Sequence, residues 1–504
     1  MRGLELEQFL QNYNTEDIIN AVILMSADSD SMLADTNIPA AEWIASNALR
    51  YNNTMDRKFD LKAYDELKQI SSNIYVPLVS EIFEEAIKYK DDSDQNKQDI
   101  LKSILMRLKN VASRGDAYQF QLMEMAEKLY QPFDADFAEV YGFSFSCCEK
   151  VFVYMYKRYI GVLFGTHVDS VKIEKIQRHS FKIPKAELYQ QFSKSEIDGM
   201  VKYLSISLGD SRIKSVGADD FKPLYSKPLI DCGEYVYFPL PVSTFLNLPK
   251  LFHYSFIAEK MFKKEVVNQY TDNRGNIIEA LTKKYLLRLF DNAYIALKYP
   301  PETKKFEADI TAQSENTTIF AEAKGKILTL PALSGELASI KNDVYKAIGK
   351  AYEQAVRSIN HLESGGSFIQ ETDEGDKKVN LDNTTWKFPI CIMAENFASI
   401  PSEIYNYLDI SDSKLMPYAV NIYDLDIITR ECISKEEFIS YLLFRQMNIQ
   451  KLTSMDELDF FGYFKQNGLV KITADADEVW AISNTDDFDK KYYSLSMRWL
   501  DEFE

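Results

Sequence analysis

The chain alternates between helix-like and strand-like runs from residue 256 to its C-terminus, and this alternation most limits how it can fold. Apolar residues recur at helical spacing in GNIIEALTKKYLLRLF (275–290) and ASIKNDVYKAIGKAYEQAVRSINHL (338–362). Five β-rich runs accompany these helices: 294–300, 304–313, 317–328, 388–396 and 418–428. The order predicts an α/β domain over residues 256–504, with a mixed central sheet flanked by helices.

Two local patterns complete the prediction for this domain. The segment ESGGSFIQETDEGDKKVNLDN (363–383) is rich in glycine and acidic residues, which predicts a loop. Two helices are expected to close the domain. Each is predicted to begin with a capping box, a serine followed by a glutamate three residues later: Ser434 with Glu437, and Ser454 with Glu457.

Residues 1–255 have a different pattern. Up to about residue 165, apolar residues recur at helical spacing, as in TNIPAAEWIASNALRY (36–51), and a polar linker at 91–99 separates two helical runs. SKPLIDCGEYVYFPLPV (226–242) has two β-rich runs around a Cys-Gly pair. We therefore expect a mainly α-helical N-terminal domain with a small β-hairpin near residues 225–242.

Composition disfavours several classes of protein. A formal net charge of −18 does not suit a protein that coats nucleic acid non-specifically, because phosphate binding depends on Lys and Arg. The acidity lies outside residues 265–360, which carry 13 Lys or Arg against 12 Asp or Glu. No apolar run approaches the roughly 18 residues of a membrane span, and the N-terminus lacks a signal-peptide pattern, so we expect a cytoplasmic protein with no membrane partner. The five cysteines lack metal-finger spacing and are expected to be reduced thiols.

Histidine chemistry and nucleotide-driven chemistry are also disfavoured. The four histidines, at 167, 179, 253 and 361, are scattered and do not have the spacing of metal ligands. The chain has no GxxxxGK[ST] phosphate loop.

The stretch FEADITAQSENTTIFAEAKGK (306–326) places charged residues in two adjacent predicted strands. Glu322 and Lys324 are two residues apart, so in a strand they project to the same side, and Asp309 in the preceding strand is expected to lie beside them. The two carboxylates and the backbone carbonyl of Ala323 suit a hard divalent cation such as Mg²⁺, for which Mn²⁺ can substitute. Lys324 is expected to orient or help deprotonate an attacking water and to stabilise charge on a phosphate, which predicts phosphodiester hydrolysis.

Asp309 followed by Glu322-x-Lys324 resembles the D…(D/E)-x-K pattern of the PD-(D/E)XK nuclease superfamily. The resemblance implies a restriction-endonuclease-like fold for the C-terminal domain and a Mg²⁺-dependent endonuclease activity. It also implies that all three residues are catalytic. Ala308 departs from the pattern, because it stands where the name-giving proline would be; that proline often varies within the superfamily.

Flanking residues extend this resemblance, which covers about residues 265–396 and leaves the N-terminal domain outside. Glu279, in the helix before the first strand, stands where many members carry an additional metal-ligating acid, and Gln354 stands where several lineages carry an active-site glutamine. Four basic residues on or near the helix of Gln354 are expected to contact nucleic-acid phosphates: Lys326, Lys346, Lys350 and Arg357. An ordinary solvated helix face is the alternative for these helical residues.

The resemblance also implies a biological context. Proteins that join a helical module to this nuclease type are often effectors of bacterial antiphage defence or restriction. The N-terminal domain is therefore expected to sense, to bind a protein partner or to form a homo-oligomer. DNA is favoured over RNA as the substrate, although no base-stacking motif separates the two. Two alternatives stay open: an RNA-directed nuclease, and a catalytically silent nuclease-fold protein that binds nucleic acid or acts as a scaffold.

Overall fold

The structure is a computed structural model, and it describes most of the 504 residues. The described residues are 4–27, 34–90, 99–100, 102–104, 106–107, 109, 116–164, 181–217, 220, 222–257, 261–299, 306–408, 410, 415–473 and 480–499. Residues 91–98 of the predicted linker lie outside them.

The chain divides into two compact units. The first comprises Met1–Lys88, Arg107–Asn268 and Ser494–Glu504, and the second comprises Tyr89–Met106 and Gln269–Tyr493. The division therefore falls within helix α14 (Lys264–Leu286), later than the boundary predicted at residue 255.

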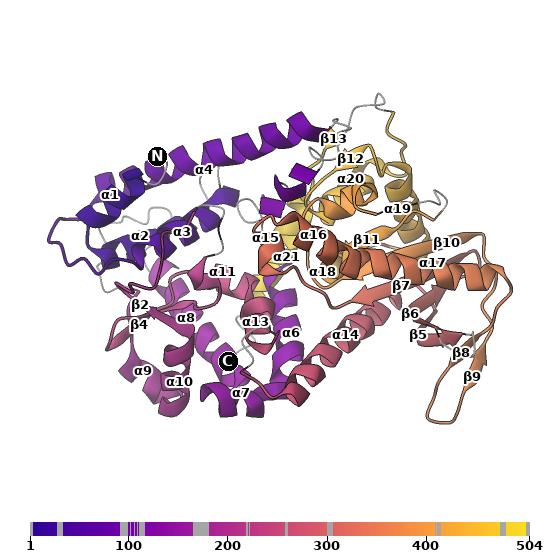
Figure 1. The fold of residues 1–504 in the computed structure, drawn as a ribbon, viewed down its shortest axis with the longest axis horizontal. Helices are drawn as coiled ribbons and strands as arrows, with labels where there is room; N and C mark the ends of the chain where they lie inside the picture. The colour runs from indigo at the N-terminus through magenta and orange to yellow at the C-terminus, as the bar shows by residue number, and fades with distance from the viewer. Residues whose placement is uncertain are drawn as a thin grey trace. The chain divides into compact units, whose positions relative to one another are not determined.

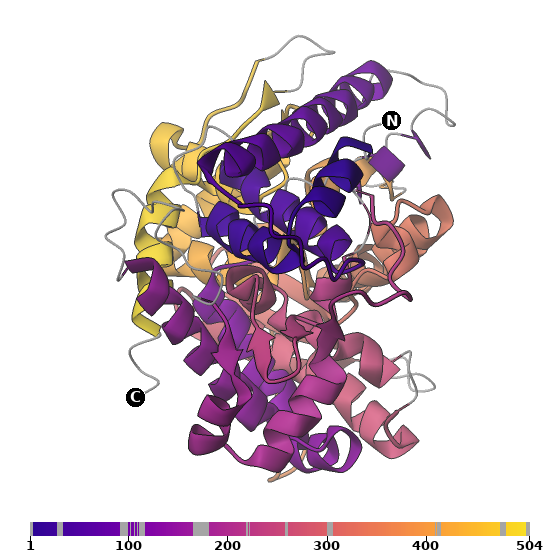
Figure 2. The same ribbon diagram turned by 90° about the vertical axis from the view of Figure 1, so that its left-hand side faces the viewer.

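The first unit is mainly helical (Figures 1 and 2). Its described helices are α1 (Leu4–Asn12), α2 (Thr15–Ala27), α3 (Ala34–Ala48), α4 (Leu61–Lys90), α6 (Gln119–Tyr130), α7 (Asp134–Tyr141), α8 (Phe145–Phe164), α9 (Lys185–Gln191), α10 (Lys194–Leu204), α11 (Pro241–Leu246), α12 (Leu248–Leu251) and α13 (His253–Ile257). Aromatic side chains fill part of its core: the rings of Phe256 and Phe262 stack 4.0 Å apart, and Phe137 meets Phe252 edge-on at 4.9 Å.

A small sheet accompanies these helices. β3 (Leu229–Asp231) and β4 (Tyr235–Tyr237) pair antiparallel, which is the predicted hairpin. Two further short strands, β1 (Ile183–Pro184) and β2 (Ser205–Ser207), extend it to four strands in the order β1-β4-β3-β2. The sequence prediction missed these strands because two or three residues are too short to show an alternating pattern.

The second unit is built on a seven-stranded mixed sheet in the order β11-β10-β7-β6-β5-β8-β9. Its strands are β5 (Asn292–Tyr299), β6 (Phe306–Gln313), β7 (Thr317–Lys324), β8 (Phe368–Gln370), β9 (Lys377–Val379), β10 (Trp386–Met393) and β11 (Tyr418–Asn421). β5, β6 and β7 form an antiparallel meander, whereas β10 runs parallel to β7 and β11 runs parallel to β10 (Figure 1). The mixed α/β prediction for this part of the chain is therefore confirmed.

Several helices accompany this sheet along the chain. They are α14, α15 (Leu330–Leu333), α16 (Leu337–Val344), α17 (Lys350–Glu363), α18 (Ile422–Glu431), α19 (Lys435–Met447), α20 (Glu457–Asn467) and α21 (Asp486–Trp499), with a 3-10 turn η6 (Ile400–Asn406) and a parallel pair of short strands, β12 (Leu452–Thr453) and β13 (Trp480–Ala481). Ala355 and Ile359 of α17 pack with Phe320 of β7 in one apolar cluster. Seven of the eight β7 residues are buried, as expected for a strand covered on both faces.

The predicted helix over 338–362 is interrupted. A π-helical turn, η5 (Tyr345–Gly349), joins α16 to α17. Gly349 permits the close packing there, because a Cβ at this position would lie 2.6 Å from the Tyr345 ring and 3.1 Å from Leu408. The prediction of one regular helix was wrong at this point, since spacing alone cannot distinguish a single π-turn from an α-turn.

Three other predictions for this unit were wrong. The segment predicted as a loop at 363–383 contains the β8–β9 hairpin, which extends the sheet beside β5. The predicted strand at 418–428 ends at Asn421, whose side chain caps α18 by accepting hydrogen bonds from the backbone N–H groups of Tyr423 and Asp424. The strand predicted at 317–328 is β7, and it ends at Lys324.

The capping predictions had mixed outcomes. The Ser434 hydroxyl accepts the Glu437 N–H at the start of α19, but the Glu437 carboxylate accepts from the N–H of Ile433 rather than that of Ser434. At α20 the cap is Asp456, which accepts the Leu458 N–H at 2.8 Å. The box predicted from Ser454 was therefore wrong.

Candidate active site

Asp309, Glu322 and Lys324 come together at the C-terminal end of β7. The Lys324 Nζ lies 3.1 Å from Asp309 Oδ2 and 4.0 Å from Glu322 Oε2. The backbone N–H of Ala323 donates a hydrogen bond to the same Asp309 oxygen at 3.0 Å. One ammonium group therefore lies between two carboxylates.

Asp309 occupies a break in the regular strand pairing. The residues Ile310 to Gln313 of β6 pair regularly with β7. At the next residue, Asp309, the side-chain carboxylate accepts the hydrogen bond of the Ala323 N–H, where a backbone carbonyl would accept it in a regular ladder. On the other side, Ala296 of β5 has a φ of 56° and falls between two registered pairs that flank Asp309. A non-glycine residue in this left-handed region is uncommon and costs about 1–3 kcal/mol, so the backbone is strained beside the aspartate.

Glu322 is the most unusual group of the site. Its side chain is 0% exposed, and neither carboxylate oxygen has a hydrogen-bond partner among the described residues. Burial raises the pKa of Glu322 well above its ordinary value, and the negative charge of Asp309 raises it further, while Lys324 opposes both effects. A buried carboxylate without donors is costly, so this position favours binding of a proton or a cation.

Two more carboxylates lie near this cluster. Burial and the charges of Asp309 and Glu307 raise the pKa of Glu279, half-buried on α14, to about 7. Glu307 stands two residues before Asp309 on β6, and burial with the Asp309 charge raises its pKa as well. The sequence analysis did not single out Glu307; its E-x-D spacing with Asp309 in a predicted strand was the available signal.

The substitution Glu279→Gln is expected to stabilise the metal-free protein increasingly as pH rises from about 4.5 to about 7. The folded-state pKa lies above the ordinary value of 4.5, so the folded protein retains a proton that the unfolded chain releases. The stability contributed by the neutral carboxyl is present below about pH 4.5 and is lost as pH rises through about 7. The check is urea unfolding in EDTA of the wild type, Glu279→Gln and Glu315→Gln, an exposed control, across this range. A pH-independent difference between wild type and Glu279→Gln would contradict the assignment.

The donor set fits a hard divalent cation in part. Among the described residues, no three His, Cys, Asp or Glu side chains are arranged as a ready-made metal cage. The two unpartnered oxygens of Glu322 and the carboxylate of Asp309 are, however, the oxygen donors that Mg²⁺ prefers. The Ala323 backbone joins the same site through its N–H, which donates to Asp309. The remaining Mg²⁺ positions would be filled by water, as is usual for this ion.

The predicted phosphate-contacting residues have different environments. Lys346 and Lys350 are exposed, on η5 and at the start of α17. The Arg357 guanidinium lies over the Phe306 ring, 4.3 Å from its centroid. Lys326 pairs with the buried carboxylate of Asp343 at 2.9 Å, so its ammonium has a structural partner.

Gln354 is half-buried on α17, between Lys350 and Arg357. Its backbone carbonyl accepts a hydrogen bond from the Ser358 hydroxyl. Within the described part of the chain, the hydrogen bonds of Asp309 and Lys324 do not include the Gln354 side chain. The structure therefore brings together the two acids and the lysine, with Glu279 nearby, but shows no bond from Gln354 to them.

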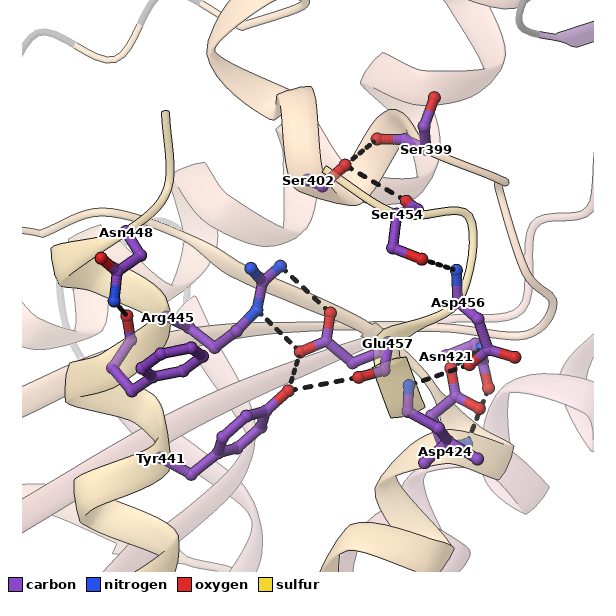
Figure 3. Close-up of polar contacts among 12 residues, drawn as sticks. Ser399, Ser402, Asn421, Asp424, Tyr441, Arg445, Asn448, Ser454, Asp456 and Glu457 are labelled. Carbon is purple, nitrogen blue, oxygen red and sulfur yellow. Dashed lines mark hydrogen bonds and ion pairs between the residues drawn. The ribbon is translucent and has the colours of Figure 1, made fainter. Parts of the chain in front are cut away.

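A second buried polar cluster lies between α19 and α20. The Arg445 Nε and Nη2 donate to the two carboxylate oxygens of Glu457 at 2.8 and 3.1 Å, and the Tyr441 hydroxyl also donates to this carboxylate (Figure 3). Arg445 is 5% and Glu457 7% exposed. The Arg445 guanidinium also lies 3.6 Å from the centroid of the Phe460 ring. Both charges are paired with good geometry, which indicates a structural role.

A polar cavity adjoins this cluster at the carboxyl ends of β10 and β11. It has room for about one water molecule, too little for a substrate. Its polar lining residues are Asn396, Ser402, Asn421, Asp424, Ser454 and Glu457. We therefore regard Asp309, Glu322 and Lys324 as the candidate active site, and this cavity as a hydration site of the fold.

All five cysteines are free thiols, and Cys391 lies in β10 directly beside Glu322 of β7. Within the described ranges, no helix combines the length and the apolar character that crossing a membrane requires. Comparison with known proteins found no family model, no curated protein and no solved structure that matches this chain.

Proposed function

We propose that this protein is a divalent-cation-dependent endonuclease of the PD-(D/E)XK type that hydrolyses phosphodiester bonds in DNA. The observation that carries the proposal is Glu322, a buried carboxylate without donors, beside Asp309 and Lys324. A buried carboxylate that accepts no hydrogen bond is costly to the fold, and strongly perturbed carboxylates tend to occur at functional sites.

The chemistry follows from the charges of this site. Asp309, Glu322 and the Ala323 carbonyl would hold Mg²⁺ or Mn²⁺, with Glu279 as a further acid close by. Such a cation acts as a Lewis acid, which makes a bound water a better nucleophile and offsets charge on the phosphate. The Lys324 ammonium lies at the open side of the two carboxylates, with 21% of its side chain exposed, where it can orient the attacking water and stabilise the phosphate charge.

The topology of the second unit supports the same proposal. A helix, an antiparallel meander of three strands, a second helix and a parallel strand follow in that order as α14, β5–β6–β7, α17 and β10. The resemblance implies a restriction-endonuclease-like fold, and this arrangement is compatible with it. The candidate residues lie on the second and third strands of the meander, where that fold carries its acids and lysine.

The proposal also covers the nucleic-acid substrate and the biological role of the protein. We favour DNA over RNA, and a cytoplasmic role as an effector of antiphage defence or restriction. The first unit would then serve as the sensing or interaction module, through a protein partner or a homo-oligomer. The exposed cations Lys346 and Lys350 are the side chains best placed to meet a phosphate backbone without reading sequence.

The decisive assay is cleavage of supercoiled plasmid, linear duplex, single-stranded DNA and RNA in Mg²⁺, Mn²⁺ or EDTA. We expect metal-dependent cutting of DNA by the wild type and none by the double variant Asp309→Ala, Glu322→Ala. Glu315→Ala, which removes an exposed acid from the turn between β6 and β7, is the matched control and is expected to cut normally. Cutting of RNA alone would change the substrate class, and equal cutting by the double variant would overturn the site.

If the wild type cuts none of these substrates, the assay is repeated with candidate protein partners and phage components. Activation by one of them would support the effector role. Continued inactivity with retained nucleic-acid binding would favour the catalytically silent alternative.

A further inference from the structure

The five residues after β7 are held by charged side chains from three different elements. The Arg274 Nη2 of α14 donates to the Gly325 carbonyl at 2.6 Å. The Glu395 carboxylate, just after β10, accepts the Leu328 N–H. The Asp343 carboxylate of α16 accepts both the N–H and the hydroxyl of Thr329, at 2.7 and 2.8 Å.

All three charged side chains are buried. Arg274 is 7% exposed, Asp343 is 0% and Glu395 is 1%. Hydrogen bonds that involve a charged group are about twice as strong as neutral ones, and a low local dielectric strengthens them further. The segment 325–329 is therefore held firmly at both of its ends, although it has no regular secondary structure.

Arg274 differs from the other two because its bond adjoins the candidate active site. Gly325 directly follows Lys324, and α14 carries Glu279 as well as Arg274. A Cβ at Gly325 would lie 3.6 Å from both the Arg274 Cβ and the Gly275 nitrogen, so α14 approaches the end of β7 to contact distance. The hydrogen bond from Arg274 to Gly325 therefore connects α14, which carries Glu279, to the end of β7, which carries Glu322.

Two further contacts fix the orientation of the guanidinium. The Arg274 Nη1 lies 3.5 Å from the Tyr270 hydroxyl, and the guanidinium carbon lies 5.7 Å from the centroid of the Tyr270 ring. Tyr270 stands one helical turn earlier on α14 and is 0% exposed. The arginine is therefore held in place before any ligand binds.

We propose that Arg274 is a positioning residue of this site: it fixes Glu322 and Lys324 relative to Glu279 by holding the Gly325 carbonyl against α14. The inference rests on the proposed nuclease function. It adds a residue that touches neither metal nor substrate, and it gives the role of α14 beyond that of carrying Glu279. Small displacements of reacting groups are costly, since a shift of about 1 Å can lower a rate by about 10²-fold.

The test compares Arg274→Met, which keeps the stem and loses the donors, with Arg274→Lys, which keeps a charged donor. Arg288→Met is the matched control. It removes a guanidinium just beyond α14 that also bonds a backbone carbonyl, that of Asp426 at 2.9 Å. Two other partners of Arg288, the Asp426 carboxylate and the Thr429 hydroxyl, are also on α18 and not on β7. Steady-state cleavage, Mn²⁺ binding followed by electron paramagnetic resonance, and thermal unfolding are measured for each variant.

We expect Arg274→Met to lower kcat by about 10- to 100-fold and to weaken Mn²⁺ binding by about tenfold, with little change in KM. Arg274→Lys is expected to recover part of both losses. Arg288→Met is expected to lower thermal stability while kcat and Mn²⁺ affinity stay near those of the wild type. Wild-type kcat and Mn²⁺ affinity in Arg274→Met, whatever its stability, would overturn the inference.

The two readouts separate this inference from the proposed function. If the wild type binds Mn²⁺ but cuts nucleic acid neither alone nor with the candidate partners, the nuclease proposal fails, and weaker Mn²⁺ binding by Arg274→Met would still support the positioning role. If the wild type neither cuts nor binds Mn²⁺, both proposals are overturned.

Discussion

Lys324→Ala is expected to lower metal-dependent cleavage by about 10²- to 10⁴-fold while the protein stays folded. The substitution removes the ammonium that lies 3.1 Å from Asp309 and 4.0 Å from Glu322. Asp309 keeps its hydrogen bond from the Ala323 N–H, so the strand pairing has no reason to fail. The loss should appear in kcat, since a group that stabilises developing charge contributes mainly in the transition state.

The measurement is single-turnover cleavage of the preferred substrate with saturating Mg²⁺, accompanied by circular dichroism. Lys378→Ala is the control, because it removes an exposed lysine from β9 of the same sheet. We expect this control to cut at the wild-type rate. A folded Lys324→Ala protein that cuts as fast as the wild type would refute the catalytic assignment.

Glu457→Ala is expected to lower the free energy of unfolding by about 3–5 kcal/mol. The substitution leaves the Arg445 guanidinium buried without its carboxylate, and it removes the carboxylate that accepts from the Tyr441 hydroxyl. An uncompensated buried charge costs much more than the intact pair contributes. The effect should be structural, because the hydrogen bonds of Arg445 and Tyr441 to Glu457 do not involve Asp309, Glu322 or Lys324.

The double variant Arg445→Met, Glu457→Leu provides the matched comparison. It removes both charges and keeps most of the apolar volume, so it should be much closer to the wild type than Glu457→Ala is. Urea unfolding of all three proteins measures the difference. If the single and double variants lose the same stability, the cost arises from lost packing and not from an unpaired charge.

The strands that carry the candidate residues were predictable because their signals are local. Glu322 and Lys324 lie within a run of apolar, β-branched residues, and the structure places that run at the centre of the sheet. The pattern of apolar and charged residues therefore indicated both the strand and the side-by-side placement of the two charges. Asp309 was predictable for the same reason, from the neighbouring strand and the short turn between them.

Other elements depend on contacts between residues that are distant in sequence. The β8 strand at Phe368–Gln370 has only three residues, and it pairs with β5 at Lys298, which no local pattern shows. The early end of β11 depends on the Asn421 cap, which ended an apolar run that otherwise suited a strand. Local apolar content therefore did not determine these boundaries.

The residues around the candidate site could not be predicted from the sequence either, because they also depend on contacts between distant segments. Lys326 has the spacing of a phosphate-binding cation, yet its partner is Asp343 on the next helix. Arg274 and Glu395 approach the end of β7 from segments about 50 and 70 residues away, so only the folded chain shows their role. Sequence patterns identified the charged centre, whereas the groups that hold it in place required the structure.

The π-turn η5 has a consequence for how such a protein can evolve. Buried residues spaced by four, such as Ile340, Val344 and Ile348, drift by about 40° per step around a regular α-helix. The π-turn has more residues per turn than an α-helix, so it partly reverses this rotation. As a result, Ala351 and Ala355 of α17 still pack against strand residues of the sheet. Gaining or losing one residue in this turn would rotate every later side chain of α17 in one mutational step. A change in the length of this turn would therefore re-aim Lys350 and Arg357 while the strands that carry the acids stay unchanged.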